Sequence, residues 1–316
     1  MNKRQLIQDN PTLLRRRPFR ALAQLLAVAV GYGAPLYFAA RIDVISVWVI
    51  ACLVAGFVLS GLFSGMHYAA HGTVFASKTA NRLVGRLMSL PIIVNFTLYK
   101  YLHLEHHKHT NVPGDTEVGG QIRSLRHYMF YLLNWDFVYV LLKIQYRALF
   151  QKEVPYFVRS ECNAKGIRLD ALLTTLWIVL IFTAALINFR AVLLLYLIPL
   201  QLAWSFNYLF SLPEHYDCEE SSDVFTSTRT IALRSRLARL FYWNSNYHAE
   251  HHLIAAVPFY NLPAAHEKIV ERLNVLEESY CAFHSRLIKS LLRRHYEPKE
   301  ASHGRLASFV YPTVRL

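Results

Sequence analysis

Charged residues are scarce in this sequence of 316 residues: Asp, Glu, Lys and Arg make up 17% of it, whereas hydrophobic residues make up 54%. A soluble domain carries about 25% charged residues, so the composition argues against an ordinary soluble protein. It is typical of a chain that buries much of itself in lipid. The formal net charge of +13 does not indicate nucleic-acid binding, because we find no concentrated basic motif of the kind that such proteins carry.

The cysteines are too few and too widely spaced to organise the chain. They are Cys52, Cys162, Cys218 and Cys281. None belongs to a Cys-x-x-Cys pair, which excludes a disulfide framework and a cysteine zinc site. The sequence also lacks the H-E-x-x-H motif of zinc proteases, a dinucleotide fingerprint and the cysteine set of an iron–sulfur protein. We find no internal repeat, low-complexity tract or Gly/Ser linker, so residues 1–316 are predicted to form a single domain.

Four apolar runs approach or reach the length of a membrane span, at about 21–40, 44–63, 171–189 and 191–212. Each is long enough for a helix that crosses ~30 Å of hydrocarbon. The first and second runs are separated by only a few residues, as are the third and fourth, so each pair is predicted to form a tight helical hairpin. The chain begins with a basic, polar segment and no small-residue cleavage site follows, so we expect the first run to be a retained span.

The charges predict how these hairpins are oriented. Of the 34 Lys and Arg residues, only Arg41 and Arg190 fall in the two hairpin tips. The other basic residues lie on the face that the N-terminal, middle and C-terminal segments share. The positive-inside rule makes that face cytosolic. We therefore expect a multi-pass membrane protein whose two termini are both in the cytosol.

Two weaker apolar stretches lie between the hairpins, at about 83–99 and 128–142. They are interrupted by Arg86, Pro91, Asn134 and Asp136. Both stretches are therefore predicted to be interfacial or re-entrant helices. Nearer the C-terminus, Pro263 suits the start of a helix. The basic amphipathic segment at 285–295 is predicted to be a helix that lies on anionic lipid.

Nine of the fifteen histidines fall into a pattern. The first box is His67-x-x-x-His71, the second is His103-x-x-His106-His107, the third is His248-x-x-His251-His252, and His215 stands alone after the fourth apolar run. Residues three and four apart lie on one helix face, with Cβ atoms about 5–6 Å apart, so each box is predicted to aim its imidazoles at one point. Each box begins near the predicted cytosolic boundary, so this topology would bring them all to one place.

Nine imidazoles are too many for a single metal ion. A catalytic zinc ion takes three or four ligands, whereas two ions would share nine nitrogens as four to five ligands each. Imidazole suits zinc, copper, iron and nickel, so the ligand type alone does not choose the metal. The pattern therefore predicts a site for two metal ions.

The three boxes, at these intervals between two helical hairpins, resemble those of integral-membrane fatty acid desaturases. The segment HLEHHKHTNVPGD (103–115) is similar to that family's second box with its trailing Thr-Asn and acidic loop. Glu214-His215, Thr228-Arg229-Thr230 and the segment NYHAEHHLIAAVPFYNLPAAH (246–266) are similar to the bacterial acyl-lipid branch. The resemblance covers roughly residues 45–270.

This resemblance implies a di-iron centre that uses O₂ and two electrons to oxidise an unactivated methylene group. By motif position, the iron ligands would be His67, His71, His103, His106, His107, His215, His248, His251 and His252. Some members place an Asn one helical turn before the histidine that His215 matches, where it holds a water. Here that position is Ser211, and Asn207 lies two turns away.

The resemblance also implies a membrane lipid or acyl chain as substrate, and a bacterial inner membrane as location. The sequence lacks the His-Pro-Gly-Gly signature of a fused cytochrome b5 domain. A separate electron donor is therefore expected, such as a ferredoxin or a cytochrome b5.

Several polar residues near the boxes are candidates for a supporting role. The acids are Glu105, Asp115, Glu117, Glu214, Asp217 and Glu250. Carboxylates would orient imidazole N–H groups and offset metal charge, and we expect about half of these acids to do so. His109 is predicted to be a polar neighbour of the site and not a ligand. The remaining histidines are predicted to be surface residues: His127, His266, His284, His295 and His303.

Together these observations predict an all-α membrane protein, with four spanning helices in two hairpins and a cytosolic helical cap that holds a di-iron site. The predicted activity is O₂-dependent desaturation of a fatty acyl chain or lipid. A lipid or carotenoid hydroxylase with the same site remains open, because the two reactions differ only in the fate of the second hydrogen. A metal-binding membrane transporter or sensor would need ionisable residues in mid-span, where this sequence has very few.

Overall fold

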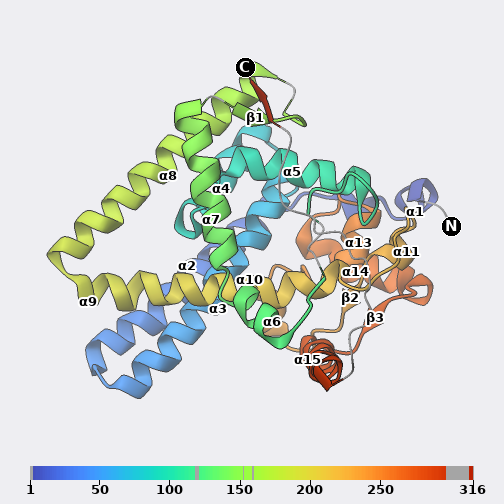
Figure 1. Ribbon diagram of the computed structural model, residues 1–316. Coiled ribbons are helices and arrows are strands. Elements are labelled where there is room, and N and C mark those ends of the chain that lie inside the picture. The colour runs from blue at the N-terminus through green and yellow to red at the C-terminus, as the bar shows by residue number, and fades with distance from the viewer. Residues whose placement is uncertain (1–2, 118–120, 152, 159, 297–312, 316) are drawn as a thin grey trace.

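The computed structural model describes residues 3–117, 121–151, 153–158, 160–296 and 313–315 of the chain, and these are mostly helical. Within them, four helices are long and apolar enough to cross a membrane: Pro18–Ile42, Ile45–Ala70, Asn163–Ile187 and Phe189–His215. They match the four predicted apolar runs. Figure 1 shows these helices projecting to one side of the molecule, with the shorter elements gathered on the other.

The helices in chain order are α1 (Lys3–Asp9), α2 (Pro18–Ile42), α3 (Ile45–Ala70), α4 (Lys78–Ser89), α5 (Phe96–His109), α6 (Leu125–Leu132), α7 (Trp135–Tyr146), α8 (Glu161–Ile187), α9 (Phe189–Val192), α10 (Ile198–His215), α11 (Val224–Ser227), α12 (Arg236–Phe241), α13 (His248–Leu253), α14 (Leu262–Ile269) and α15 (Tyr280–Tyr296). The short strands are β1 (Glu153–Pro155), β2 (Thr230–Ile231), β3 (Leu276–Glu277) and β4 (Thr313–Arg315). β1 pairs with β4 in antiparallel orientation, and β2 pairs with β3 in parallel orientation.

Two of the long helices continue beyond the predicted runs. α3 ends at Ala70 and α10 ends at His215. His67 and His215 therefore lie in the last turns of these helices, beyond the apolar runs themselves. An apolar run stops where the side chains become polar, whereas the backbone hydrogen bonds of a helix do not depend on that change. Both histidines are consequently held at the end of a long, rigid helix.

The links within each pair of long helices are very short and lie against each other. Asp43 and Val44 separate α2 from α3, and Asp43 has a left-handed conformation, with φ 50°, of the kind that ends a helix. Asn188 separates α8 from α9, and its side chain accepts a hydrogen bond from the N–H of Ala191. Arg190 Nη2 lies 2.5 Å from Asp43 Oδ1. Both links therefore lie at the same end of the molecule, on the left of Figure 1.

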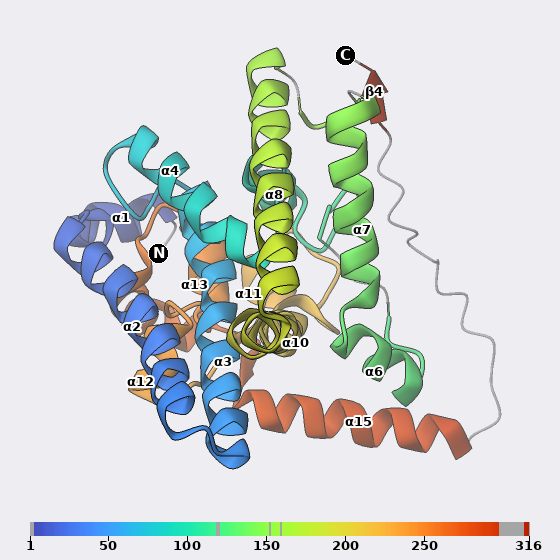
Figure 2. The ribbon, with the colours of Figure 1, turned by 90° about the vertical axis from the view of Figure 1, so that its left-hand side faces the viewer.

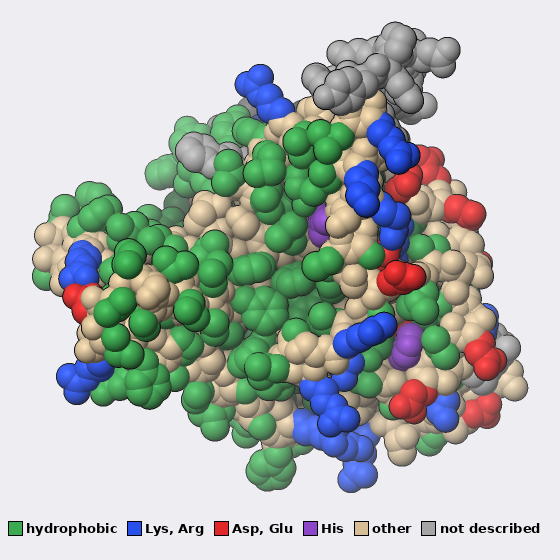
Figure 3. Space-filling view, turned by 90° about the horizontal axis from the view of Figure 1, so that it is seen from below, with side chains coloured by type: hydrophobic (Ala, Val, Ile, Leu, Met, Phe, Trp, Pro, Cys, Tyr) green, Lys and Arg blue, Asp and Glu red, His purple; other side chains and the backbone are tan. Residues whose placement is uncertain are grey.

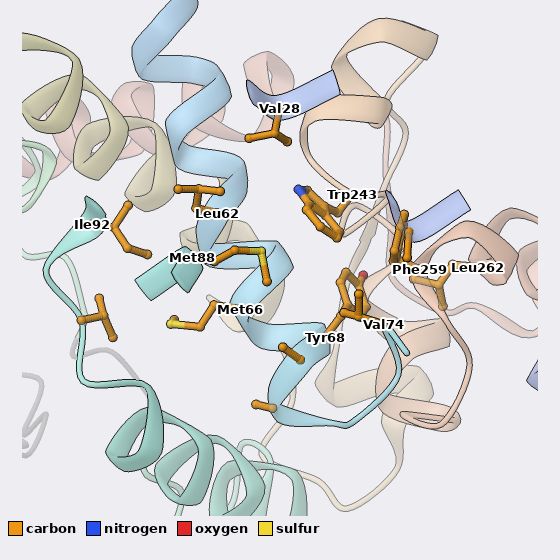
Figure 4. Close-up of a cluster of buried hydrophobic side chains, with 14 of the residues drawn as sticks. Val28, Leu62, Met66, Tyr68, Val74, Met88, Ile92, Trp243, Phe259 and Leu262 are labelled. Carbon is orange, nitrogen blue, oxygen red and sulfur yellow. The ribbon is translucent and has the colours of Figure 1, made fainter. Parts of the chain in front are cut away.

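α3 packs against both α2 and α10 and is the central helix of the fold. A Cβ atom at Gly61 would lie 1.9 Å from the carbonyl oxygen of Phe241, so only glycine fits at this close approach. The buried Trp243 follows, and its ring lies 4.7 Å from that of Phe259. Figure 4 shows both rings in one cluster with Tyr68 of α3. This cluster holds the segment that leads into α13 against α3, and so brings the third box beside the first.

Each of the two weaker apolar stretches contains two helices and not one. In the first, Pro91 ends α4 and a 3₁₀ turn (Leu90–Ile92) precedes α5. The carbonyl oxygens of Pro91 and Ile92 accept hydrogen bonds from Tyr196 Oη (2.9 Å) and Trp204 Nε1 (3.2 Å), both in the fourth long helix. Irregular backbone packed between such helices needs partners of this kind. In the second stretch, Asn134 adopts φ 53° between α6 and α7.

α10 contains two prolines, and each leaves a carbonyl oxygen without its usual helical partner. Pro199 has no N–H to donate to the carbonyl oxygen of Leu195, and this oxygen accepts a hydrogen bond from Tyr32 Oη at 2.6 Å instead. In the same way, Pro213 cannot donate to the carbonyl oxygen of Leu209, which accepts a hydrogen bond from His284 Nε2 at 2.8 Å. Figure 2 shows α15, which carries His284, lying beside α6.

The prediction that His284 is a surface residue was therefore wrong, because it joins α15 to the proline-containing end of α10. The predicted helix near Pro263 begins one residue earlier, at Leu262. The segment 285–295 lies within α15, as a helix. His303 and the side chain of His295 lie outside the described residues.

The outer faces of the long helices are apolar. Leu26, Ile50, Leu176 and Phe182 are each more than 60% exposed. Figure 3 shows hydrophobic side chains over the part of the surface formed by these helices, whereas most Lys, Arg, Asp and Glu side chains gather elsewhere. Large exposed apolar surfaces of this kind are suited to lipid contact.

Candidate metal centre

The nine predicted histidines gather into two clusters near the C-terminal ends of α3 and α10. The five-histidine cluster consists of His67, His71, His103, His107 and His251. The four-histidine cluster consists of His106, His215, His248 and His252. Within each cluster, one ring nitrogen of every histidine lies within 4.8 Å of the others. The fold thus unites side chains from α3, α5, α10 and α13, together with His71, the C-cap of α3.

The second and third boxes divide their histidines between the clusters in opposite ways. On α5, His103 and His107 belong to the five-histidine cluster and His106 to the other. On α13, His248 and His252 belong to the four-histidine cluster and His251 to the other. The prediction that each box aims at one point was wrong for these two boxes. Neighbouring residues in a helix diverge by about 100°, so each His-His pair reaches two points at once.

The spacing of the ring nitrogens fits a shared ion in each cluster. In the five-histidine cluster, His251 Nε2 lies 2.7 Å from His67 Nε2 and 3.1 Å from His107 Nε2. In the four-histidine cluster, His248 Nε2 lies 3.0 Å from His215 Nε2 and 3.1 Å from His252 Nε2. Two nitrogens bound at about 2.1 Å to one ion, at a right angle, are about 3.0 Å apart.

Hydrogen bonds alone explain these contacts poorly. An imidazole nitrogen carries either one hydrogen or one lone pair. His251 Nε2 therefore cannot make two well-directed hydrogen bonds, one to His67 and one to His107. A cation between the rings would use the lone pair of each. The histidines consequently fit metal binding by their own chemistry.

Most of these imidazoles are held in the neutral form that binds metals. Burial lowers the pKa of His71, His103, His107, His248, His251 and His252. Burial also acts on His106, but the negative charges of Glu117 and Asp115 outweigh it and raise the pKa of His106. A neutral ring offers a lone pair, so these clusters are poised to bind cations.

Three of the six predicted acids contact clustered histidines, which confirms that part of the prediction. Asp115 Oδ1 lies 2.7 Å from His106 Nδ1, and Glu117 Oε1 lies 2.9 Å from His103 Nδ1. Glu214 Oε1 lies 3.4 Å from His248 Nδ1. Such carboxylates orient the ring and increase its basicity. The prediction of about half did not say which acids these would be, because nearness in sequence to a box does not decide which way a side chain points.

Glu105 and Glu250 are buried but have other partners. Glu105 pairs with Lys108 at 2.6 Å and lies 3.5 Å from His109. Glu250 accepts hydrogen bonds from Thr230 and from His266. His266 was wrongly predicted to be a surface residue, and no spacing rule in the sequence links it to Glu250. His109 belongs to neither cluster.

Several supporting contacts had no signal in the sequence. Thr110 Oγ1 lies 3.2 Å from His252 Nδ1, and the carbonyl oxygen of Ser227 lies 3.1 Å from His215 Nδ1. Tyr99 Oη lies 3.3 Å from His67 Nδ1. A hydroxyl or a backbone carbonyl can support a ring from any element, so such partners follow no spacing.

A cavity of about 660 Å³ adjoins both clusters. Its walls include His67 and His103 from one cluster, and His215 and His248 from the other. Apolar walls come from Phe63, Leu212, Phe283 and Leu287. Ser211 and Asn207 also line it. The cavity can therefore hold a partly apolar molecule against both groups of histidines.

A family model described as fatty acid desaturase matches residues 43–286. The sn-1 oleoyl-lipid 12-desaturase of Picosynechococcus sp. is 33% identical over 97 residues, which are 30% of this chain and 27% of that protein. The protein of the same description from Anabaena variabilis is 33% identical over 96 residues, with the same coverage of 30% and 27%. The matched stretch thus spans about a quarter of the length of these curated relatives.

Proposed function

Because the chain belongs to the fatty acid desaturase family, we propose that it is an O₂-dependent oxidoreductase that introduces a double bond into an acyl chain of a membrane lipid. The observation that carries the proposal is the pair of histidine clusters beside a cavity with apolar walls. The two cyanobacterial relatives are described as acting on oleoyl-lipid. Their similarity supports a lipid-linked acyl chain as the substrate.

The proposed cofactor is a pair of iron ions, one in each cluster, held by the nine histidines. Bound iron would supply the redox chemistry by which O₂, two electrons and two protons convert –CH₂–CH₂– into –CH=CH– and two water molecules. The family supports iron, since imidazole alone fits several metals. His103, His106 and His248 would be fixed by the carboxylates of Glu117, Asp115 and Glu214.

The cavity residues would place one part of the acyl chain beside the histidines. Phe63 of α3 and Leu212 of α10 bring apolar surface next to His67 and His215, which lie one turn further along the same helices. Holding a methylene near the oxidant contributes to the rate by proximity and orientation. The rigid ends of α3 and α10 would therefore fix both the chain and two of the metal ligands.

The proposed topology has two membrane hairpins, with both termini and the histidine clusters in the cytosol. The contact between Arg190 and Asp43 supports it, because it keeps both hairpin tips at one surface. The one-sided distribution of Lys and Arg supports the orientation. Cysteines placed at Asp43 and Asn188 should react with an impermeant thiol reagent outside intact cells. Reaction only from the cytosolic side would contradict this topology.

Electrons are proposed to come from a separate protein, such as a ferredoxin or a cytochrome b5, because the sequence has no second redox motif. The donor would need access to the cytosolic side, where the clusters lie. Reconstitution with each candidate donor, followed by measurement of product formation, would identify the partner.

Lipid analysis of a host that expresses the protein tests the activity directly. We expect an acyl product that has lost two hydrogens, and no such product with the His251→Ala variant. Gain of one oxygen instead would assign the protein as a hydroxylase. Unchanged lipids in a host with a competent donor and loaded metal would contradict the proposed function.

A further inference from the structure

Tyr99 contacts two histidines of the five-histidine cluster that come from different helices. It lies on α5, one turn before His103, and its ring stacks on that imidazole with centroids 5.4 Å apart and planes 9° apart. Its hydroxyl oxygen lies 3.3 Å from His67 Nδ1 at the end of α3. The side chain also forms part of the cavity wall. Tyr99 therefore touches both the five-histidine cluster and the cavity beside it.

The five-histidine cluster has few other supports of this kind. Glu117 holds His103, but His251 Nδ1 is buried without a hydrogen-bond partner among the described residues. The outer nitrogen of His67, Nδ1, has the hydroxyl of Tyr99 as its partner among the described residues. A change at Tyr99 should therefore act on His67 more than on any ring of the four-histidine cluster.

The hydrogen positions follow from the way His67 faces the cluster. Its Nε2 lies 2.7 Å from His251 Nε2, so the Nε2 lone pair points to the proposed ion. The hydrogen of a neutral imidazole then lies on Nδ1. His67 Nδ1–H consequently donates to Tyr99 Oη, and the phenol keeps its own hydrogen to donate. Since the side chain lines the cavity, that hydrogen is available to a molecule held there.

We propose that Tyr99 is a positioning residue, which fixes the rings of His67 and His103 and presents a hydroxyl donor to the cavity. This inference rests on the proposed two-metal site. Partners of metal-bound imidazoles typically contribute about 10–100-fold to metal affinity or activity. Loss of the Tyr99 hydroxyl should therefore weaken one metal position and leave the other unchanged.

The test compares Tyr99→Phe with Tyr101→Phe in the full-length, iron-loaded protein. The first change keeps the stacked ring and removes the hydroxyl. The second is a matched control on the same helix, where Tyr101 packs against a different cluster of apolar residues. Release of iron to a chelator is followed over time, together with the amount of product formed per O₂ consumed.

We expect Tyr99→Phe to release one of its two irons about 10–100-fold faster than the wild type, with the second iron unchanged. Less product should form per O₂. Tyr101→Phe should match the wild type. Tyr99→Leu, which also removes the stacking on His103, should release the same iron faster still.

Equal iron release from Tyr99→Phe, Tyr101→Phe and the wild type would overturn the inference and leave the proposed function intact. Faster release of both irons to the same extent would overturn it too, because it would show a general loosening of the fold. A wild-type protein that is active with one iron would instead refute the two-metal site on which the inference rests.

Discussion

The two histidine clusters differ in how their outer ring nitrogens are held. In the four-histidine cluster, every outer nitrogen has a partner. These partners are Asp115, Glu214, the Ser227 carbonyl oxygen and Thr110. In the five-histidine cluster, Glu117 and Tyr99 support His103 and His67, whereas the outer nitrogen of His251, Nδ1, is buried without a partner among the described residues.

The two clusters therefore differ in the number of their histidines and in how many of these histidines have a second, supporting contact. The four-histidine cluster has fewer imidazoles, but each is oriented by a second contact, which makes a rigid site. The five-histidine cluster has one more imidazole, but fewer of its rings are held by a second contact. We therefore expect the two metal positions to differ in exchange rate, and the following changes test that difference.

The largest effects are expected from neighbouring histidines that belong to different clusters. His106→Ala and His107→Ala should each reduce activity to background, because both metal positions are needed. Each should lower the metal content from about two ions per chain toward about one. His127→Ala, on α6 and outside both clusters, should keep most activity and both metals.

Spectra of the two variants should differ, because each retains a different position. Metal analysis and Mössbauer spectroscopy of the iron-loaded proteins would check this. Identical spectra for His106→Ala and His107→Ala would break the assignment of these neighbours to separate sites.

His215→Ala should also abolish activity while the protein still inserts and accumulates in the membrane. His215 comes from the end of α10, and its Nε2 lies 3.0 Å from His248 Nε2. Iron content should fall toward about one per chain, with the five-histidine position retained. Full activity with two irons would show that His215 is not a ligand, and immunoblotting of membranes would show whether the variant accumulates.

A smaller effect is expected from the carboxylates that support each cluster. Asp115→Asn and Glu117→Gln keep the side-chain shape and remove the charge beside His106 and His103. Each should lower metal affinity or activity by about 10–100-fold. The effect should be larger for Asp115, whose side chain is 1% exposed, than for Glu117, which is 28% exposed.

Chelator competition with the purified variants measures these affinities. Asp115→Asn should release iron from the four-histidine position first, and Glu117→Gln from the other. Release from the same position in both variants would contradict the distinction between the clusters.

The smallest effect on activity is expected from a change at His284, which is outside both clusters. His284→Leu removes the donor to the Leu209 carbonyl oxygen and the acceptor for Tyr128 Oη. An unpaired buried polar group costs about 1–3 kcal/mol, so the free energy of unfolding should fall by about that amount. Tyr128→Phe removes only the second hydrogen bond and should cost less.

Thermal unfolding of both variants in detergent, followed by circular dichroism, would rank them. Since α10 carries His215, a loosened α10 should disturb the four-histidine cluster only. A stability equal to that of the wild type for His284→Leu would show that the proline-exposed carbonyl needs no partner.

The long helices and the nine histidines were predictable because they follow simple periodic rules. An apolar run of bilayer length indicates a helix, and spacings of three and four place side chains on one helix face. The division of each His-His pair was not predicted, because spacing within one helix does not say where a second metal lies. That information comes from tertiary contacts between the two boxes, such as those of His107 with His251 and of His106 with His252.

The supporting contacts were predictable only in part. Asp115 and Glu117 lie close to the second box in sequence, and a short loop can return them to it. Tyr99, Thr110 and the Ser227 carbonyl oxygen contact histidines from other elements or through the backbone. The contacts of His266 and His284 were not predicted for a related reason. A lone histidine belongs to no spacing pattern, so the sequence does not link His266 to Glu250, or His284 to the carbonyl oxygen that Pro213 leaves unpaired.

The most direct test of the account is the iron content of the active protein, measured together with the kinetics of its loss. Purified, catalytically competent wild type should contain about two irons per chain. A chelator should remove them in two phases, with the slower phase assigned to the four-histidine cluster by its loss in His106→Ala. Full activity with one metal per chain, or two irons that leave at a single rate, would contradict a centre built from two unequal sites.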